Sequence, residues 1–153
     1  SLIKSNLILN ETGIINDSFL LGVFHNGIQP VLPTSEATSL EVKPTHIERD
    51  FFMLLKVRSF SDIFPIMLSW EKKMLFDLHG FFGVDITPVT SYLFTKSFED
   101  EIIENKNARV IKDKDGKIVL MYVFIDDSSV IVTNSDKSTE EVIRRLNSSK
   151  IKK

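Results

Sequence analysis

The sequence predicts an α+β fold: an antiparallel meander sheet of five to seven strands, one long helix packed on it at about residues 59–79, and a short C-terminal helix at about 139–147. Eight consecutive apolar residues within Lys117–Asp126 are rich in β-branched and aromatic side chains, which favours a strand. Because both faces of that strand are apolar, we expect it to be the central strand, covered on both sides. Apolar residues in Ser59–Gly80, among them Phe60, Phe64 and Leu68, recur at the three- and four-residue steps of a helix, which predicts that they form its buried face.

Composition indicates one soluble domain over residues 1–147, followed by a frayed basic tail at 148–153. The 153 residues are 42% hydrophobic and include twelve Phe, enough for a sizeable core. The net charge of −2, without a basic stripe, argues against nucleic acid as a partner. No apolar run approaches the ~20 residues that span a bilayer. We therefore expect any membrane contact to come from a segment absent from this chain, which does not begin with Met.

The first third of the chain predicts a strand followed by a long loop. Phe19–Phe24 is apolar and ends at an Asn-Gly turn. Ile28–Leu32 is expected to return as an edge strand or an extended loop, because Pro30 and Pro33 cannot donate to a ladder. Residues 33–48 are rich in Pro, Ser, Thr and Glu and predict a long surface loop, and such loops are either mobile or functional.

The remaining elements follow from apolar runs and capping residues. Phe51–Val57 is a second dense apolar strand, and Ser59 with Asp62 predicts the start of the long helix, which Gly80 ends. Glu71 is expected on the solvent side of that helix. Thr90–Phe94 is either a helical turn or a strand.

The last third predicts a meander and a closing helix. Strands are expected at 98–104, where helical turns are the alternative, and at 109–112, 118–125 and 130–133. Residues Asn105–Asn107 would join the first two of these strands. Ser138 with Glu141 forms a capping box that predicts the helix at 139–147.

Residues able to carry chemistry form no catalytic or cofactor-binding pattern. The three histidines share no ligand spacing, and the absence of cysteine excludes disulfides, thiolate metal sites and cysteine nucleophiles. Asp113 and Asp115 resemble part of a calcium loop, but the other ligands are missing, so a hairpin turn is the better interpretation. Trp70 at its helical spacing predicts a core residue rather than a stacking surface beside Glu71. No cofactor or metal is expected.

A contact patch is the site that the sequence favours. Phe81 and Phe82 follow directly on the helix, and two adjacent aromatic residues there rarely both point inward. We therefore predict a contact patch of Phe81 and Phe82, together with Pro33 and Pro44 from the long loop.

Two parts of the chain resemble a known family. The residues that carry the resemblance in the first part are Ser59, Phe60, Met67, Leu68, Trp70, Glu71, Met74, Asp77, Leu78 and Phe82. Those in the second part are Phe98, Asp100, Ile103, Asn105, Lys106, Arg109, Val110, Gly116, Tyr122, Phe124, Ile125, Asp126, Ile131, Thr133, Arg145 and Leu146. About two-thirds of the chain thus resembles the soluble C-terminal module of uncharacterised membrane-anchored proteins of small-genome uncultivated bacteria. The insertion at 33–48 departs from the family.

The resemblance implies an upstream transmembrane helix and an extracytoplasmic position in the cell envelope, with the cytoplasm as the alternative, but it transfers no functional residue. We expect a non-catalytic domain that acts through an unknown protein partner; the oligomeric state is left open. The alternative is a small-ligand-binding or enzymatic domain with a site between the 33–48 loop and the sheet, using Arg109, Glu71 or His79. A phage or secretion-apparatus component is a third class.

Overall fold

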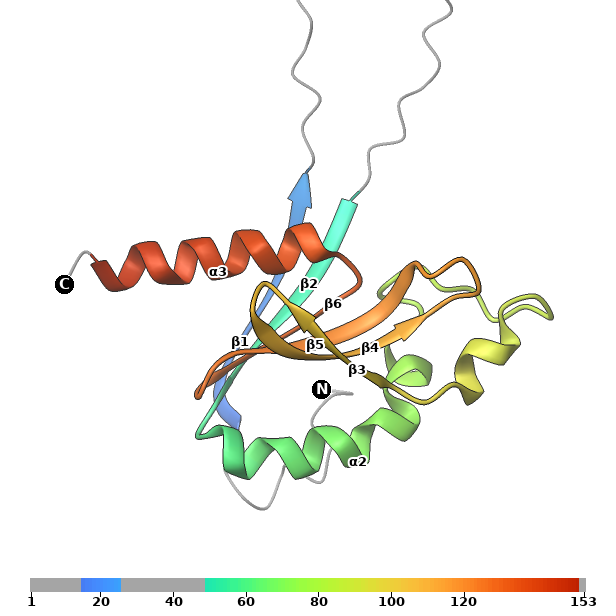
Figure 1. Cartoon of the computed structure of the whole chain (residues 1–153), viewed down its shortest axis with the longest axis horizontal. Coiled ribbons are helices and arrows are strands. Elements are labelled where there is room, and N and C mark those ends of the chain that lie inside the picture. The colour runs from blue at the N-terminus through green and yellow to red at the C-terminus, as the bar shows by residue number, and fades with distance from the viewer. Residues whose placement is uncertain (1–14, 26–48, 152–153) are drawn as a thin grey trace, which may run out of the picture.

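The computed structural model describes residues 15–25 and 49–151 and shows a six-stranded antiparallel sheet with a helix on each face (Figure 1). The strands are β1 (Ile15–His25), β2 (Arg49–Val57), β3 (Glu99–Ile103), β4 (Lys106–Lys112), β5 (Ile118–Asp126) and β6 (Ser129–Thr133). The helices are α2 (Phe60–Leu78), α3 (Asp136–Ile151) and the 3-10 helix η1 (Ser91–Thr95). The predicted α+β class is confirmed. The predicted return strand Ile28–Leu32 and the 33–48 loop lie outside the described residues.

The strand order β1-β2-β6-β5-β4-β3 places β5 inside the sheet, as its apolar run predicts. Tyr122 and Phe124 face α2, whereas Met121 and Val123 face α3, and all four are buried. Alternate residues of a strand point to opposite faces, so a strand between two helices needs apolar residues at every position.

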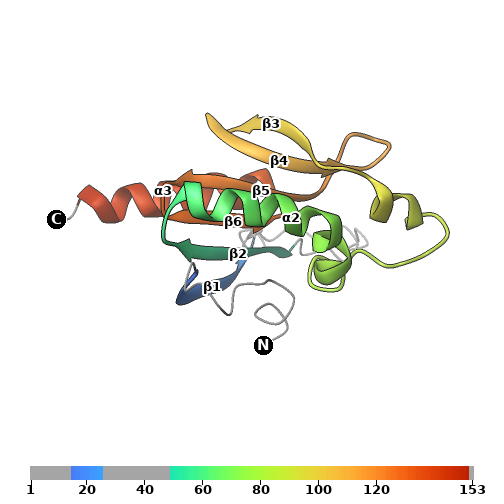
Figure 2. The same ribbon diagram turned by 90° about the horizontal axis from the view of Figure 1, so that it is seen from below.

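Helix α2 begins where two side chains satisfy its first amides. Ser59 Oγ accepts from the Asp62 amide at 3.3 Å, as predicted, and Asp127 in the β5–β6 turn accepts from the Phe60 amide at 3.2 Å. The second contact ties the start of α2 to one end of the sheet. Figure 2 shows α2 lying along β5 and β6, while the β3–β4 hairpin rises away from it.

Helix α3 differs from its predicted bounds at both ends. Its first turn is capped by Ser135, whose Oγ accepts from the Ser138 amide at 3.3 Å and donates to Asp50 at 2.9 Å. The predicted capping residue Ser138 is instead buried inside the helix. The helix continues to Ile151, so the predicted tail is helical over 148–151, where Ser148 donates to the Arg144 carbonyl.

The smaller open questions are also decided. The stretch Thr90–Phe94 is a helical turn, because Thr90 precedes η1 and the residues after it lie within η1, and residues 99–103 form a strand. The turn between β3 and β4 was predicted at residues 105–107 but lies at Glu104 and Asn105. The φ values of these two residues, 49° and 57°, are those of a two-residue hairpin turn. Strand β4 therefore begins at Lys106 instead of Arg109.

Candidate functional site

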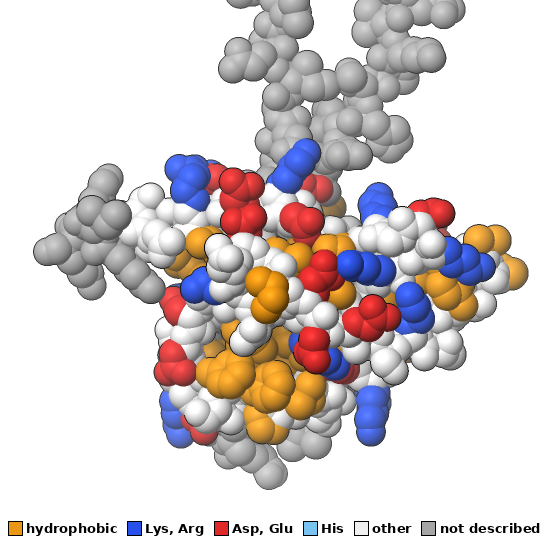
Figure 3. All heavy atoms as spheres, in the orientation of Figure 1, with side chains coloured by type: hydrophobic (Ala, Val, Ile, Leu, Met, Phe, Trp, Pro, Cys, Tyr) orange, Lys and Arg blue, Asp and Glu red, His pale blue; other side chains and the backbone are white. Residues whose placement is uncertain are grey.

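The candidate site is a hollow between the first half of α2 and the β3–β4 hairpin. Its volume is about 370 Å³, and we call it the aromatic hollow. It is lined by Phe60, Phe64, Asp100, Glu101, Ile102, Asn107, Ala108, Arg109 and Phe124. Figure 3 shows hydrophobic side chains gathered at the surface between β3 and α2, with acidic side chains beside them.

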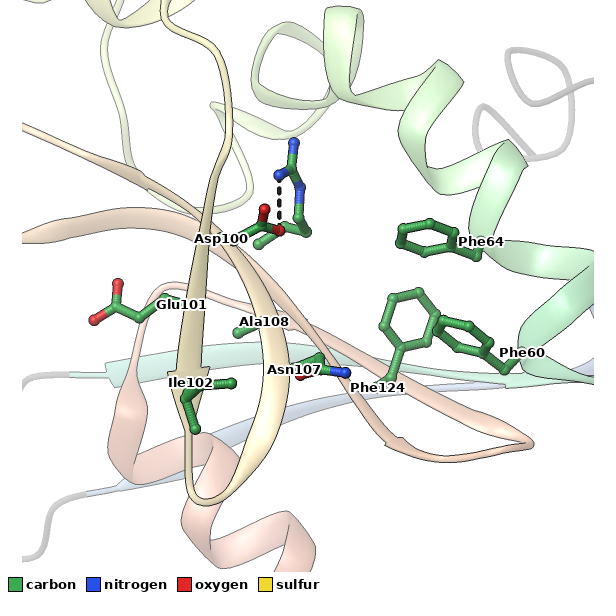
Figure 4. Close-up of a pocket in the computed structure, with 9 residues that line it drawn as sticks. Phe60, Phe64, Asp100, Glu101, Ile102, Asn107, Ala108 and Phe124 are labelled. Carbon is green, nitrogen blue, oxygen red and sulfur yellow. Dashed lines mark hydrogen bonds and ion pairs between the residues drawn. The ribbon is translucent and has the colours of Figure 1, made fainter.

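One stripe of α2 forms the first wall. Phe60 and Phe64 line the hollow. Leu68 and Glu71 follow them at steps of four and three residues, so they continue the same side of the helix beyond the hollow. Phe60 and Phe64 stack with ring centroids 5.1 Å apart, and both meet Phe124 of β5 edge to face. Figure 4 shows the three rings together at one side of the hollow.

The second wall is the β3–β4 hairpin. Asp100 pairs with Arg109 and Ile102 pairs with Asn107 across the two strands. Because side chains alternate along a strand, these four residues share the face that looks toward α2. Glu101 points to the other side of β3 (Figure 4), where it meets Lys112 at 2.7 Å.

A cluster of charged side chains, made by Arg109, Glu71 and Asp100, lies at one end of the hollow. Arg109 donates to both carboxylate oxygens of Glu71, from Nε at 2.8 Å and from Nη2 at 2.9 Å, and its Nη1 donates to Asp100 at 2.9 Å. Tyr122 donates its hydroxyl to Glu71 at 2.6 Å. The prediction that Glu71 faces solvent is wrong, because the carboxylate is the link between α2 and the sheet.

Both donors of this cluster, Arg109 and Tyr122, keep their protons across ordinary pH. The hydrogen bonds to Glu71 raise the pKa of Arg109 above its usual value, so the guanidinium stays charged. Burial, and next the hydrogen bond to Glu71, raise the pKa of the Tyr122 phenol, so the hydroxyl keeps its proton. A charged donor and a neutral donor thus both hold the Glu71 carboxylate.

Strand β3, which lines the hollow, is an edge strand in the described part of the chain. Strand β3 is last in the sheet order, and no other strand in the described part of the chain pairs with its outer edge. Ile102 is 64% exposed on this strand. Three of the five β3 residues are acidic, and Glu104 follows them. An apolar hollow therefore lies beside an acidic strand whose outer edge has no partner strand among the described residues.

The two aromatic residues of the predicted contact patch differ in their exposure. Phe82 is only 7% exposed and belongs to the core, so its ring offers little surface for contact. Phe81 is half-buried and packs edge to face on Phe51, with ring centroids 5.3 Å apart. Pro33 and Pro44 lie outside the described residues, so their part of the patch stays a prediction.

The other predicted candidates are separated by the fold. Trp70 is buried, as predicted, and donates its ring N–H to Asp77 at 2.8 Å. His79 follows α2, where its Nδ1 lies 2.9 Å from the Val84 carbonyl. Eight residues of helix separate His79 from Glu71, roughly 12 Å. Glu71, Arg109 and His79 therefore do not converge on one site.

The acidic turn before β5 is a hairpin turn, as predicted. Asp113 accepts from the amides of Asp115 and Lys117, both at 2.9 Å, and Gly116 adopts a φ of 79°. These backbone contacts occupy the Asp113 carboxylate. Within residues 15–25 and 49–151, no group of three His, Asp or Glu side chains is arranged to hold a metal ion.

Sequence reasoning missed the aromatic hollow because it assigned Phe60, Phe64 and Leu68 to the buried face of α2. The buried stripe consists of Ile63, Met67, Trp70, Met74, Leu75 and Leu78. The sequence did contain a signal for the hollow, because the apolar residues of α2 form two adjacent stripes. Together these stripes are wider than the surface that one face of the sheet can cover.

Comparison of the chain with protein-family models, with curated proteins and with solved structures finds no match. The resemblance described above stays a prediction. Among the helices that the structure describes, none is long and apolar enough to cross a membrane.

Proposed function

We propose that this chain is a non-catalytic module that acts through protein–protein contacts, and that the aromatic hollow with the β3 edge is its contact surface. The observation that carries the proposal is an exposed apolar residue, Ile102, on β3, whose outer edge has no partner strand in the described part of the chain and which lies beside a hollow lined by three aromatic rings. An extended segment of a partner can add to such an edge through its backbone and place alternate side chains in the neighbouring hollow.

The charges define the kind of segment. The stretch 99–109 carries four acidic and two basic residues, and one of the basic residues, Arg109, is already held by Glu71. The Asp100 side chain is 90% exposed although it also contacts Arg109. We therefore propose a partner segment that alternates apolar with basic residues, since a basic segment gains from this field and an acidic one is repelled.

A small apolar molecule is the second candidate for the same hollow. A volume of about 370 Å³ is sufficient for such a ligand. The side chains that line the hollow are three aromatic rings with the polar groups of Asp100, Asn107 and Arg109 at its border. A small ligand would use the rings but would not need the β3 edge, which separates the two candidates.

The test measures binding of two synthetic peptides to the full chain. One alternates valine with lysine, and the other alternates valine with glutamate. We expect the lysine peptide to bind more tightly, and Ile102→Ser, which removes the apolar contact without changing the charge, to weaken it at least tenfold. Ile86→Ser is the matched control, because Ile86 is 53% exposed and does not line the hollow. Equal binding of both peptides, or no effect of Ile102→Ser, contradicts the proposal.

We also propose that the module belongs to a membrane-anchored envelope protein and lies on the extracytoplasmic side. The resemblance supports this location. Protease treatment of intact cells that express the full-length gene product tests it: the module should be digested from outside. Protection in intact cells, with digestion only after lysis, would assign the module to the cytoplasm.

A further inference from the structure

Strand β1 is the other edge of the sheet among the residues that the structure describes, and it differs from β3 in its chemistry. Strand β1 presents Phe19, Leu20, Leu21 and Val23, each between 43% and 56% exposed. From Ser18 to Phe24 the strand contains no charged residue and no proline. Natural edge strands usually carry charges, prolines or other features that prevent pairing with another chain. Strand β3 has three acidic residues, whereas this part of β1 has no such protection.

Both faces of β1 are apolar at this edge. Phe19, Leu21 and Val23 pair with Leu55, Met53 and Phe51 of β2, so they extend the core that α2 covers. The views in Figures 1 and 2 place β1 at the border of the sheet, beyond α2. Helix α2 therefore does not cover the exposed apolar surface of Phe19, Leu21 and Val23.

On the other face, Leu20 borders a groove of about 310 Å³ between β1 and α3. Val142 and Leu146 of α3 line its far side, together with Arg145. Gly22 lies under the ring of Phe52, which occupies the space where a side chain at residue 22 would be. A strand added to β1 would therefore meet apolar groups on both of its own faces.

We propose that β1 pairs antiparallel with β1 of a second copy of this chain, joining two six-stranded sheets across a two-fold axis at Leu21. The strand suits itself as a partner because no two like charges meet in this overlap. With Leu21 opposite Leu21, Leu20 falls opposite Gly22 and contacts the Phe52 ring.

The backbone agrees with this arrangement. In an antiparallel pair, opposite residues must both point their N–H groups toward the partner or both point them away. A register centred on Leu21 joins residues 19 with 23 and 20 with 22, each separated by an even number of positions, so this condition holds. The surface is isologous, which closes the assembly at two copies. It uses the edge opposite to β3 and stands independently of the proposed function.

The test measures the molar mass of the full chain over a concentration series by sedimentation. We expect the mass to rise from monomer to dimer. Leu21→Lys should stay monomeric throughout, because two lysines would meet at the axis, while Ile86→Lys should dimerise like the parent chain. An equal mixture of Leu21→Lys and Leu21→Glu should recover the dimer. A parent chain that stays monomeric, or a dimer that survives Leu21→Lys, overturns the proposal.

A second measurement does not depend on the charged variants. The chain has no cysteine, so Leu21→Cys introduces the single thiol. Directly opposite residues of an antiparallel pair are close enough for a disulfide. We expect mild oxidation to give a cross-linked dimer, whereas Ile86→Cys should remain uncross-linked at the same concentration. Equal cross-linking of both variants, or none at position 21, would place the contact elsewhere. A dimer lost on Ile102→Asp but kept with Leu21→Lys would assign it to β3.

Discussion

Arg109 on β4 holds both carboxylate oxygens of Glu71 on α2, at 2.8 and 2.9 Å, and this pair fixes the helix against the sheet at the end of the aromatic hollow. Both side chains are largely buried, with 19% and 13% of their surfaces exposed. The pair therefore sets how far the hollow opens, because Phe60 and Phe64 lie on the same stripe of α2 as Glu71.

Replacing Glu71 with alanine should destabilise the fold by about 1–3 kcal/mol, since it leaves a largely buried guanidinium and the Tyr122 hydroxyl with fewer partners. Chemical denaturation measures the change. Glu141→Ala is the control, because Glu141 pairs with Arg144 and Arg145 at the exposed surface of α3 and its loss should be far smaller. If Glu71→Ala and Glu141→Ala are equally mild, the Glu71 cluster does not hold α2 in place.

The Tyr122 phenol should resist ionisation in the folded protein. Its raised pKa means that its stabilising contribution is complete below the ordinary tyrosine value of about 10 and is lost only as the pH rises through the higher folded value. The variant Tyr92→Phe removes the other tyrosine, so phenolate absorbance then reports Tyr122 alone. We expect this absorbance to appear only at a pH where circular dichroism shows unfolding. Phenolate formation near pH ~10 in a folded chain would contradict the buried hydrogen bond to Glu71.

Trp70 should be a main contributor to the core beneath α2. It is 5% exposed, so Trp70→Ala should cost about 3–5 kcal/mol in the free energy of unfolding. Phe76→Ala on the same helix is the control, because Phe76 is 63% exposed and its loss should stay within about 0.5 kcal/mol. A comparably small change for Trp70→Ala would show that the ring is accessible for binding.

Replacing either of the two serines at the start of α3 with alanine should affect the stability of the fold differently. Ser135→Ala removes the side-chain cap and the bond to Asp50, so a loss of about 1 kcal/mol is expected. Ser138 Oγ is buried with no hydrogen-bond partner within the described part of the chain, so Ser138→Ala should be neutral or stabilising. Thermal melts of both variants decide whether Ser135 or Ser138 caps the helix. A larger loss of stability for Ser138→Ala than for Ser135→Ala would support the capping box expected from the sequence.

The sequence was informative wherever burial alone decides the structure. Strands β5 and β6 are buried on both faces, which leaves a continuous apolar run in the sequence, and α2 shows the helical period of its buried stripe. The start of α3 was missed because the capping role of Ser135 depends on Asp50, a residue distant in the chain. The aromatic hollow depends on the angle at which α2 crosses the sheet and on the way the β3–β4 hairpin diverges from α2. The residues next to Phe60 and Ile102 in the sequence do not encode this tertiary arrangement.

Hydrogen exchange at the amides of β3 tests the central claim most directly. The outward-pointing amides of Glu99–Ile103 have no strand partner in the described part of the chain and should exchange readily in the free protein. With the valine–lysine peptide bound, we predict that these amides become protected while those of η1 do not change. A bound peptide that leaves the β3 amides unprotected would contradict strand addition at this edge.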